Sequence, residues 1–213
     1  MTKDAPLLVA SAPLAWTTTL AALAADSKPL LAADGGANHI ARIGLRPDAV
    51  IGDFDSVSPS TRAWLGEEPF VHRPDQDRTD LDKAVEYAFG ELGLDRLTVL
   101  AALGGRPDHD LGNLGLLARM AVGEKLVFLG SDHRTLAVTG ELSIKARPGE
   151  TWSFWTYDPS VRVTVEGVRW PIERAAIDPA GRPSISNEAI QNEVRILAEG
   201  GAVIVMRQHD TSI

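Results

Sequence analysis

The stretch AVIGDFDSVSP, residues 49–59, places two aspartates directly after a short apolar run. Residues 48–53 have the composition of a buried β-strand, and Asp53, Asp55 and Ser56 stand where that strand ends. Ligands of parallel α/β sheets bind outside the carboxyl ends of the strands. Two carboxylates separated by one residue on an irregular turn can converge on a hard cation such as Mg²⁺. Taken alone, the motif also fits a solvated turn in which Asp55 caps a helix.

Strand and helix patterns alternate on both sides of this stretch. Short apolar runs predict β-strands at 6–12, 29–34, 48–53, 95–103 and 125–130. Apolar residues at helical spacing predict helices at 14–25, 36–44, 78–93 and 111–122. Thr79 or Asp80 can begin the third of these helices. The alternation predicts an α/β domain with a mainly parallel sheet that helices cover on both faces.

From about residue 131 the chain has short stretches of alternating apolar and polar residues and no helix of normal length. These stretches predict strands at 133–146, 151–158, 161–168, 183–187 and 193–207. Turn-forming pairs are expected to separate the strands: Thr139-Gly140, Pro148-Gly149, Asp158-Pro159 and Gly200-Gly201. The sequence therefore predicts an α/β domain at 1–130 and an all-β domain, a sandwich or small barrel, at 131–213.

Composition excludes several classes of protein. The chain has 213 residues, a formal net charge of −8 and no cysteine, which excludes disulfides, thiolate catalysis and cysteine metal ligands. The acidic balance, without a Lys/Arg-rich run, disfavours nucleic acid as a partner. The N-terminus lacks the layout of a signal peptide, and no apolar run reaches membrane-spanning length. We therefore expect a cytoplasmic protein that binds no membrane.

Other loops at the predicted sheet edge also suggest phosphate binding. Asp34-Gly35-Gly36 follows a strand and opens a helix, so its amides can bind a phosphate group. Gly104-Gly105-Arg106 follows another strand and adds a guanidinium group. Asp80 and Arg78 lie at the start of a helix. Each motif alone also fits an ordinary turn or a solvated charge. Together they indicate phosphoryl chemistry with a divalent cation.

The motifs of other nucleotide enzymes are missing from the sequence. It contains no G-x-x-x-x-G-K-[ST], which excludes a P-loop enzyme, and no clean G-x-G-x-x-G after the first strand, which disfavours a dinucleotide oxidoreductase. A serine-centred nucleophile elbow is also missing.

Five segments resemble the thiamine pyrophosphokinase (thiamin diphosphokinase) family and occur in its order and spacing. They are DGGAN (34–38), PDAVIGDFDS (47–56), PDQDRTDLDKAV (74–85), GGRPDHDLGN (104–113) and SNE (186–188). The resemblance implies a nucleotide-binding α/β domain, a β-sandwich domain for thiamine binding and dimerisation, and a homodimer. It also implies transfer of a diphosphate group from ATP to the hydroxyl of thiamine, giving thiamine diphosphate and AMP.

The same resemblance implies roles for individual residues. The catalytic Mg²⁺ ligands are Asp53, Asp55 and Asp80. The residues expected to contact ATP are Asp34, Gly35, Gly36, Asn38, Gln76, Arg78, Thr79, Gly104, Gly105 and Arg106. Those expected at the thiamine end are Asp108, His109, Ser186, Asn187 and Glu188. Trp152, Trp155 or Trp170 can stack on thiamine, and a place in the sandwich core is the alternative for each.

Two other functions remain open at this point. A Mg²⁺-dependent nucleotidyltransferase would use the same aspartates but release pyrophosphate instead of AMP. A sensor would bind thiamine or a nucleotide without turnover. The intact set of Asp53, Asp55 and Asp80 disfavours the sensor, because a protein that only binds does not need a metal cluster.

Overall fold

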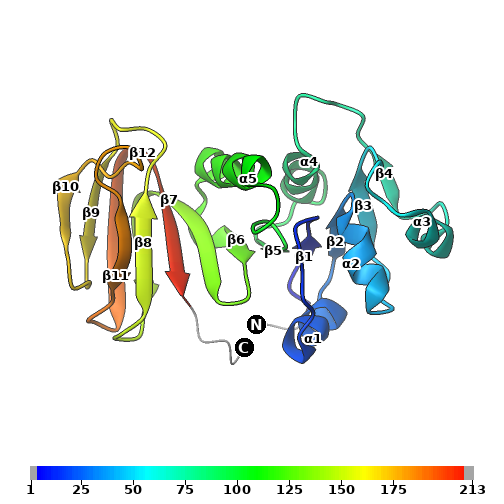
Figure 1. Cartoon of the computed structure of the whole chain (residues 1–213), viewed down its shortest axis with the longest axis horizontal. Coiled ribbons are helices and arrows are strands. Elements are labelled where there is room, and N and C mark those ends of the chain that lie inside the picture. Colours follow the sequence, from blue (N-terminus) through cyan, green and yellow to red (C-terminus); the bar gives the residue numbers. More distant parts are fainter. Residues whose placement is uncertain (1–3, 209–213) are drawn as a thin grey trace. The chain divides into compact units, whose positions relative to one another are not determined.

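The computed structural model describes residues 4–208 and divides into two compact units, one ending at Asn113 and one starting at Leu114. Strands and helices alternate in the first unit, and the second is mainly β-structure, so the predicted fold class is confirmed (Figure 1). The division falls within helix α5 (Pro107–Met120). The domain boundary at residue 130 follows from the change in sequence pattern and stays a prediction.

The first unit is built on a sheet with the strand order β5-β1-β2-β3-β4. Every neighbouring pair along this order is parallel. The side chains of β1, β2 and β3 are all buried, as expected for a sheet covered on both faces. The strand bounds are β1 Leu7–Val9, β2 Leu30–Ala33, β3 Ala49–Gly52, β4 Phe70–His72 and β5 Leu97–Leu100.

Helices connect the strands of this unit, and polar caps define where several of them begin. The predicted helices are observed as α1 (Thr18–Asp26), α2 (Gly36–Arg42), α4 (Asp80–Glu86) and α5. Thr79 caps α4 by accepting a hydrogen bond from the backbone N–H of Asp82, which confirms the predicted start of this helix. The helix then continues as a π-helical turn over Tyr87–Glu91. α2 packs against β1 and β2, and α4 packs against β2 and β3.

The apolar periodicity predicts neither helix α3 (Pro59–Leu65) nor strand β4, and a helix here is expected only in the alternative in which Asp55 is the cap. α3 has only seven residues, of which Thr61 and Leu65 are buried, so it shows no clear helical period. Ser58 nevertheless caps it by accepting from the backbone N–H of Thr61, with Pro59 in the first turn. β4 has three residues, none of them fully buried, because it forms the edge of the sheet.

The second unit consists of antiparallel strands that enclose one core. β12 (Glu193–Gln208) pairs with β7 (His133–Lys145) along its length, with β9 over its first part and with β8 over its last part. The core between these strands includes Trp152, Phe154 and Val163. The remaining bounds are β6 Leu126–Leu129, β8 Thr151–Trp155, β9 Arg162–Glu166, β10 Ile172–Ala175 and β11 Ser184–Glu188.

Two predicted turns of this unit are wrong. Gly140 lies inside β7 and Gly200 inside β12, with φ angles of 68° and 83°. The pairing register of the two strands shifts between Ala198 and Val203. The glycines therefore bend two long strands at an irregularity in the ladder instead of ending them. Pro148-Gly149 and Asp158-Pro159 do separate strands. The sequence pattern does not predict strand β10, because only Ile172 of its four residues is buried and its apolar and polar residues do not alternate.

The three tryptophans of the second unit have different environments. Trp152 is fully buried and stacks on Phe154 at 6.1 Å between ring centroids, as expected for the sandwich core. Trp155 is half-buried, and its ring centroid lies 5.2 Å from that of Tyr157. Trp170 is 57% exposed, so the core alternative is wrong for this residue. Within residues 4–208, no helix is long and apolar enough to cross a membrane.

His39 is a buried titratable group in α2. Its Nε2 lies 3.0 Å from the carbonyl oxygen of Ala12, and its Nδ1 lies 3.5 Å from Arg42 Nη1. These partners fit the neutral tautomer in which Nε2–H donates to Ala12 and Nδ1 accepts from Arg42. Burial lowers the pKa of His39, and the charge of Arg42 lowers this pKa further against the opposing effect of the Ala12 carbonyl.

We expect His39→Gln to reduce the loss of stability in acid. A histidine whose folded pKa lies below its unfolded value stabilises the fold above the unfolded pKa, and this stability is lost as the pH falls through the folded pKa. Glutamine keeps a donor for Ala12 but does not titrate. Denaturant unfolding from about pH 7.5 to about pH 5 measures the effect. The unaltered chain should lose more unfolding free energy than the variant, and parallel curves would contradict the prediction.

Candidate active site

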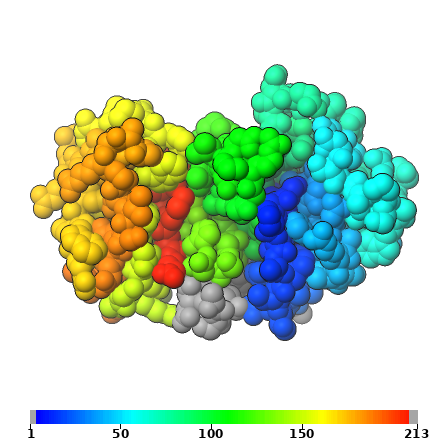
Figure 2. Space-filling view, in the orientation of Figure 1, coloured from blue at the N-terminus to red at the C-terminus, as the bar shows by residue number. Residues whose placement is uncertain are grey.

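A cavity of about 630 Å³ lies in the first unit at the carboxyl ends of β1, β2, β3 and β5. The start of α4 and the loop that precedes it complete its wall. This loop, residues 73–79, projects from the unit in both views (Figure 1 and Figure 2). The polar lining residues are Ser11, Asp34, Asp53, Asp55, Ser56, Gln76, Arg78, Thr79, Asp80, Lys83, Arg106, His109, Asp110 and Asn113. The predicted acidic motifs therefore meet at one edge of the sheet.

Three carboxylates converge in this cavity. Asp34, Asp53 and Asp80 each offer an oxygen, and these oxygens all lie within 4.8 Å of one another. Gly52 makes this approach possible, because it has a φ of 153° and no side chain. A Cβ atom at position 52 would lie 2.9 Å from Asp34 Cβ and 3.1 Å from Asp80 Oδ1. Any larger residue there would therefore force the carboxylates apart.

Asp34 is the most buried member of this cluster, with 1% of its surface exposed. Its Oδ2 accepts a hydrogen bond from the backbone N–H of Ser56 at 3.1 Å, whereas Oδ1 has no partner among the described residues. Burial and, to a smaller extent, the charge of Asp80 raise the pKa of Asp34 to about 6. A buried carboxylate oxygen without a partner is costly, and a cation would offset this cost. The donor set fits a hard divalent cation.

Asp53 is held in its ionised form at the mouth of the cluster. Its Oδ2 accepts a hydrogen bond from Gln76 Nε2 at 3.0 Å, and its Oδ1 accepts from the backbone N–H of Asp55 at 3.2 Å. The Gln76 hydrogen bond is the main reason that the pKa of Asp53 is lowered. Gln76 comes from the projecting loop, so this loop helps to orient a carboxylate of the cluster.

Asp80 and Lys83 form an ion pair within one turn of α4. Lys83 Nζ lies 3.0 Å from Asp80 Oδ1, and Lys83 is only 3% exposed. The helix cap at Thr79 places Asp80 at the first helical position, so that Lys83 lies on the same face. The buried ammonium group offsets part of the negative charge that three neighbouring carboxylates create. Lys83 has no role in the sequence prediction, although its spacing of three residues from Asp80 is a usable signal.

Asp55 lies at the edge of this cluster. It is exposed, and its Oδ1 accepts a hydrogen bond from the Ser56 hydroxyl at 2.8 Å. Its side chain also raises the pKa of Asp34, to a smaller extent than burial and Asp80 do. The structure thus brings Asp53 and Asp80 together as the sequence predicts. It adds Asp34, which the sequence assigns to the nucleotide, as the third carboxylate of the compact group.

The Asp34-Gly35-Gly36 segment has a packing role in this structure. Gly35, Gly36 and Asn38 are not among the residues that line the cavity. A Cβ atom at Gly36 would lie 2.0 Å from the carbonyl oxygen of Val9, so only glycine lets α2 begin against β1. Asn38 Nδ2 donates to the Ser56 carbonyl at 2.9 Å, and its Oδ1 accepts from the Ser58 backbone N–H at 3.0 Å. These residues fix the backbone beside the cavity.

The Gly104-Gly105 turn is bound by a carboxylate of its own chain. Asp110 accepts from the backbone N–H of Gly104 at 3.1 Å through each of its oxygens, and from that of Gly105 at 3.4 Å. Asp110 lies in the first turn of α5, where a carboxylate also interacts favourably with the helix dipole. The amides that the sequence assigns to a phosphate group therefore have an internal anion as partner. Asn113 fixes the same segment, because its Nδ2 donates to the Ala102 carbonyl at 2.7 Å.

Two arginines on the rim of the cavity pair with exposed carboxylates. Arg78 Nε lies 2.8 Å from Asp75 Oδ2, and Arg78 also pairs with Glu86. Arg106 Nη2 lies 2.6 Å from Asp108 Oδ2, and this contact lowers the pKa of Asp108 to about 2. Exposed ion pairs contribute little free energy, so an anionic ligand can compete for both guanidinium groups. Of the two residues predicted at the thiamine end here, His109 lines the cavity and Asp108 does not.

The SNE motif lies in the second unit, on β11, and does not line this cavity. Asn187 is buried. Its Oδ1 accepts a hydrogen bond from the backbone N–H of Trp170 at 3.2 Å, and its Nδ2 donates to the Trp170 carbonyl oxygen at 2.7 Å. Glu188 forms an ion pair with Arg169, whose Nη2 lies 2.8 Å from Glu188 Oε1. Ser186 has a φ of 58°, and its backbone N–H donates to Ser153 Oγ at 3.1 Å. In this structure the motif ties β11 to the segment around Trp170.

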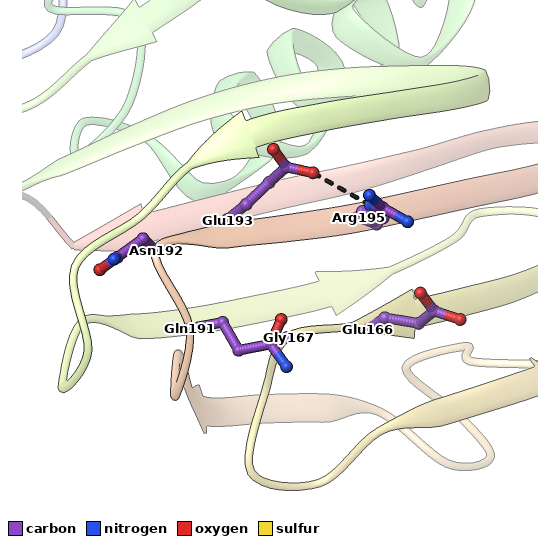
Figure 3. A pocket seen from close by; sticks show the side chains of 6 residues that line it. All are labelled: Glu166, Gly167, Gln191, Asn192, Glu193 and Arg195. Carbon is purple, nitrogen blue, oxygen red and sulfur yellow. Dashed lines mark hydrogen bonds and ion pairs between the residues drawn. The ribbon is translucent and has the colours of Figure 1, made fainter.

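A second hollow, of about 430 Å³, lies in the second unit beside the start of β12. Figure 3 shows Glu193 and Arg195 pointing toward each other, with Glu166 further along β9. Arg195 Nε lies 3.0 Å from Glu193 Oε1. Gly167 is needed there, because a Cβ atom would lie 2.2 Å from the Glu193 carbonyl oxygen. Glu193 and Arg195 are exposed and already paired with each other, so this hollow is a weaker candidate than the cavity of the first unit.

Two family models match the chain. The model described as thiamin pyrophosphokinase, catalytic domain, matches residues 20–128, which is more than half of the chain. The model described as thiamin pyrophosphokinase, vitamin B1 binding domain, matches residues 141–203. The first match contains the acidic cluster, and the second contains the SNE motif.

Curated relatives and solved structures agree with these matches. Thiamine pyrophosphokinase 1 of Oryza sativa subsp. japonica is 29% identical over 200 residues, with 80% of this chain and 75% of the relative covered. Thiamine pyrophosphokinase of Bacillus subtilis (strain 168) is 27% identical over 184 residues, with 83% of this chain and 86% of the relative covered. The crystal structure of thiamine pyrophosphokinase from Bacillus subtilis matches with 25% sequence identity and a TM-score of 0.78. The match covers 97% of this chain and 99% of the chain in that structure. The chain therefore belongs to the thiamin pyrophosphokinase family.

Proposed function

We propose that this thiamine diphosphokinase transfers the diphosphate group of ATP to the hydroxyl of thiamine, with Mg²⁺ bound by the acidic cluster of the first unit. The thiamine hydroxyl oxygen attacks the β-phosphorus of ATP. The bond between this phosphorus and the oxygen that links it to the α-phosphate breaks, and AMP leaves. Atoms and charge balance, because the hydroxyl proton is released and the products are thiamine diphosphate and AMP.

The observation that best supports the proposal is the buried Oδ1 of Asp34, which has no partner within residues 4–208 and lies in a group of three carboxylates. Together with Asp53 and Asp80 it offers the oxygen ligands that Mg²⁺ prefers. Asp55, which the motif predicts as a ligand, lies at the edge of this group and is retained in the proposal. Held by these residues, Mg²⁺ would supply positive charge that offsets the negative charge of the transition state.

We assign the nucleotide to the wall of the same cavity. Gln76, Arg78, Thr79 and the segment 104–106 line that wall, where Arg78 and Arg106 supply guanidinium donors, whereas the Gly104 and Gly105 amides already bind Asp110. Donors of this kind suit the oxygens of a triphosphate. Gly35, Gly36 and Asn38 contribute to this site by fixing the backbone next to Asp34 and Ser56.

The thiamine end of the site stays a prediction. Asp108 and His109 lie at the start of α5, near the rim of the cavity. Ser186, Asn187 and Glu188 lie in the unit that the vitamin B1 binding model matches. We retain them as thiamine contacts, and we likewise retain the homodimer and the cytoplasmic location as predictions.

Product analysis tests the proposal directly. The protein is incubated with ATP, Mg²⁺ and thiamine, and the nucleotides and thiamine species are separated by chromatography. We expect AMP and thiamine diphosphate in equal amounts. Pyrophosphate with a nucleotidylated acceptor would instead identify a nucleotidyltransferase. Thiamine binding without any product would identify a sensor, and either of these results would overturn the proposal.

Asp53→Ala is expected to abolish turnover and leave the fold intact. Asp53 is exposed enough to be removed without a cavity, and its carboxylate takes part in the proposed cation site. We expect a loss of at least about a hundredfold in kcat/KM, because Mg²⁺ supplies much of the charge stabilisation in phosphoryl transfer. Asp77→Ala is the matched control, since Asp77 lies in the neighbouring loop and does not line the cavity.

Circular dichroism and thermal unfolding check that Asp53→Ala and Asp77→Ala both keep the fold. Full activity at saturating Mg²⁺ would exclude Asp53 as a metal ligand. Equal losses in Asp53→Ala and Asp77→Ala would show that the effect does not depend on the cluster.

Lys83→Met should destabilise the metal-free protein by roughly 1–3 kcal/mol, because Asp80 loses its partner while it remains near two other carboxylates. Mg²⁺ should then raise the Tm of this variant more than that of the unaltered chain, because the cation replaces the missing positive charge. Thermal unfolding in EDTA and in Mg²⁺ measures both effects. Lys145→Met, at an exposed lysine of β7, is the control, and equal Tm gains in all three proteins would contradict the prediction.

A further inference from the structure

Phe54 stands between the two aspartates of the motif, and it has no contact with the cavity that they line. Its ring packs instead against strand β4. The ring centroids of Phe54 and Phe70 are 4.8 Å apart in an edge-to-face arrangement, and His72 lies 5.6 Å away. A turn that exposes two carboxylates on one side is thus attached to the edge of the sheet on its other side.

Arg62 of helix α3 covers this aromatic contact. Its guanidinium carbon lies 5.7 Å from the Phe54 ring centroid and 5.1 Å from that of Phe70. Both distances are in the range of cation–π interactions. α3 and β4 therefore supply a binding place for one side chain of the motif, which we call the Phe54 anchor: Phe54, Arg62, Phe70 and His72.

The backbone at Phe54 requires such an anchor. Its φ of 71° lies in the left-handed region, which a residue with a Cβ seldom adopts. The backbone N–H of Asp55 donates to Asp53 Oδ1 at 3.2 Å and closes the turn over Phe54. Strained backbone of this kind persists only where its surroundings hold it, and it is frequent next to functional groups.

We propose that Phe54 is a positioning residue, whose ring, held by Arg62, Phe70 and His72, keeps the Asp53 carboxylate in the geometry that binds a divalent cation. The inference rests on the proposed function, because it gives the cation site of that reaction a support that never touches the substrate. Residues that orient metal ligands from outside typically change metal affinity by about ten- to a hundredfold when they are removed.

Mn²⁺ is the probe for this role, because its binding to the full chain can be followed by electron paramagnetic resonance without nucleotide or thiamine. We expect Phe54→Ala to weaken Mn²⁺ binding by about tenfold or more. Phe54→Gly should weaken it as well, although glycine adopts a positive φ without strain, because the ring is missing. Phe54→Tyr keeps the ring and should restore most of the affinity.

Trp64→Leu is the matched control. Trp64 lies on the same helix as Arg62, and its ring also contacts an arginine, Arg46, at 4.7 Å. The substitution removes a comparable aromatic contact from α3 without removing a member of the Phe54 anchor. Its Mn²⁺ affinity and its activity should match those of the unaltered chain.

Arg62→Gln is a second test that does not depend on the folding of Phe54→Ala. Arg62 is exposed, so its replacement leaves the core intact. Loss of the cation–π contacts should weaken Mn²⁺ binding by about two- to fivefold. No change in this variant, together with no change in Phe54→Gly, would overturn the inference.

Turnover separates positioning from a general loss of stability. In Phe54→Ala, the Mg²⁺ concentration for half-maximal formation of thiamine diphosphate should rise about tenfold, with kcat at saturating Mg²⁺ within about threefold of the original. Equal Mn²⁺ affinities of Phe54→Ala and Trp64→Leu would overturn the inference even if the unaltered chain is active. If the unaltered chain makes no thiamine diphosphate, the proposed function fails, while a tenfold difference in Mn²⁺ affinity would still support the positioning role.

Discussion

Mutual repulsion of three carboxylates, two that follow β2 and β3 and one at the start of α4, is the constraint on which the first unit depends. Asp34, Asp53 and Asp80 place negative charge within 4.8 Å, partly away from water. Separate contacts oppose the repulsion: Lys83 pairs with Asp80, Gln76 donates to Asp53, and the Ser56 amide donates to Asp34. Among the residues that the structure describes, Oδ1 of Asp34 has no partner, and burial, followed by the charge of Asp80, raises the pKa of Asp34 to about 6.

The segments around the cluster have the conformations that this convergence requires. Gly52 lacks the Cβ atom that would separate Asp34 from Asp80. Phe54 adopts a left-handed conformation that costs about 1–2 kcal/mol. An aromatic pair contributes about 0.5–1.5 kcal/mol and a cation–π contact at an exposed site about 0.5–1 kcal/mol, so the contacts with Phe70 and Arg62 are sufficient to offset the strain. The short elements α3 and β4 thus support the acidic turn.

The glycine pairs of the first unit show that one sequence feature can have different physical causes. Gly36 is required because the backbone of β1 approaches it closely, which is a constraint of helix–sheet packing. Gly104 has a φ of 93° and an amide that binds Asp110, so this turn is fixed by a carboxylate before any ligand is present. Both pairs lie next to the cavity, but only Gly104 and Gly105 line it.

The sequence by itself determined the α/β and β-rich halves, the strands that end in aspartate, the helix start at Thr79 and the family, because these depend on local periodicity, capping and motif order. Only the tertiary structure decided which carboxylates meet, because the distance between Asp34 and Asp80 depends on how β2, β3 and α4 pack. It also decided that Gly140 and Gly200 bend strands, since a glycine at positive φ is compatible with a turn or a bulge until its partner strand is known.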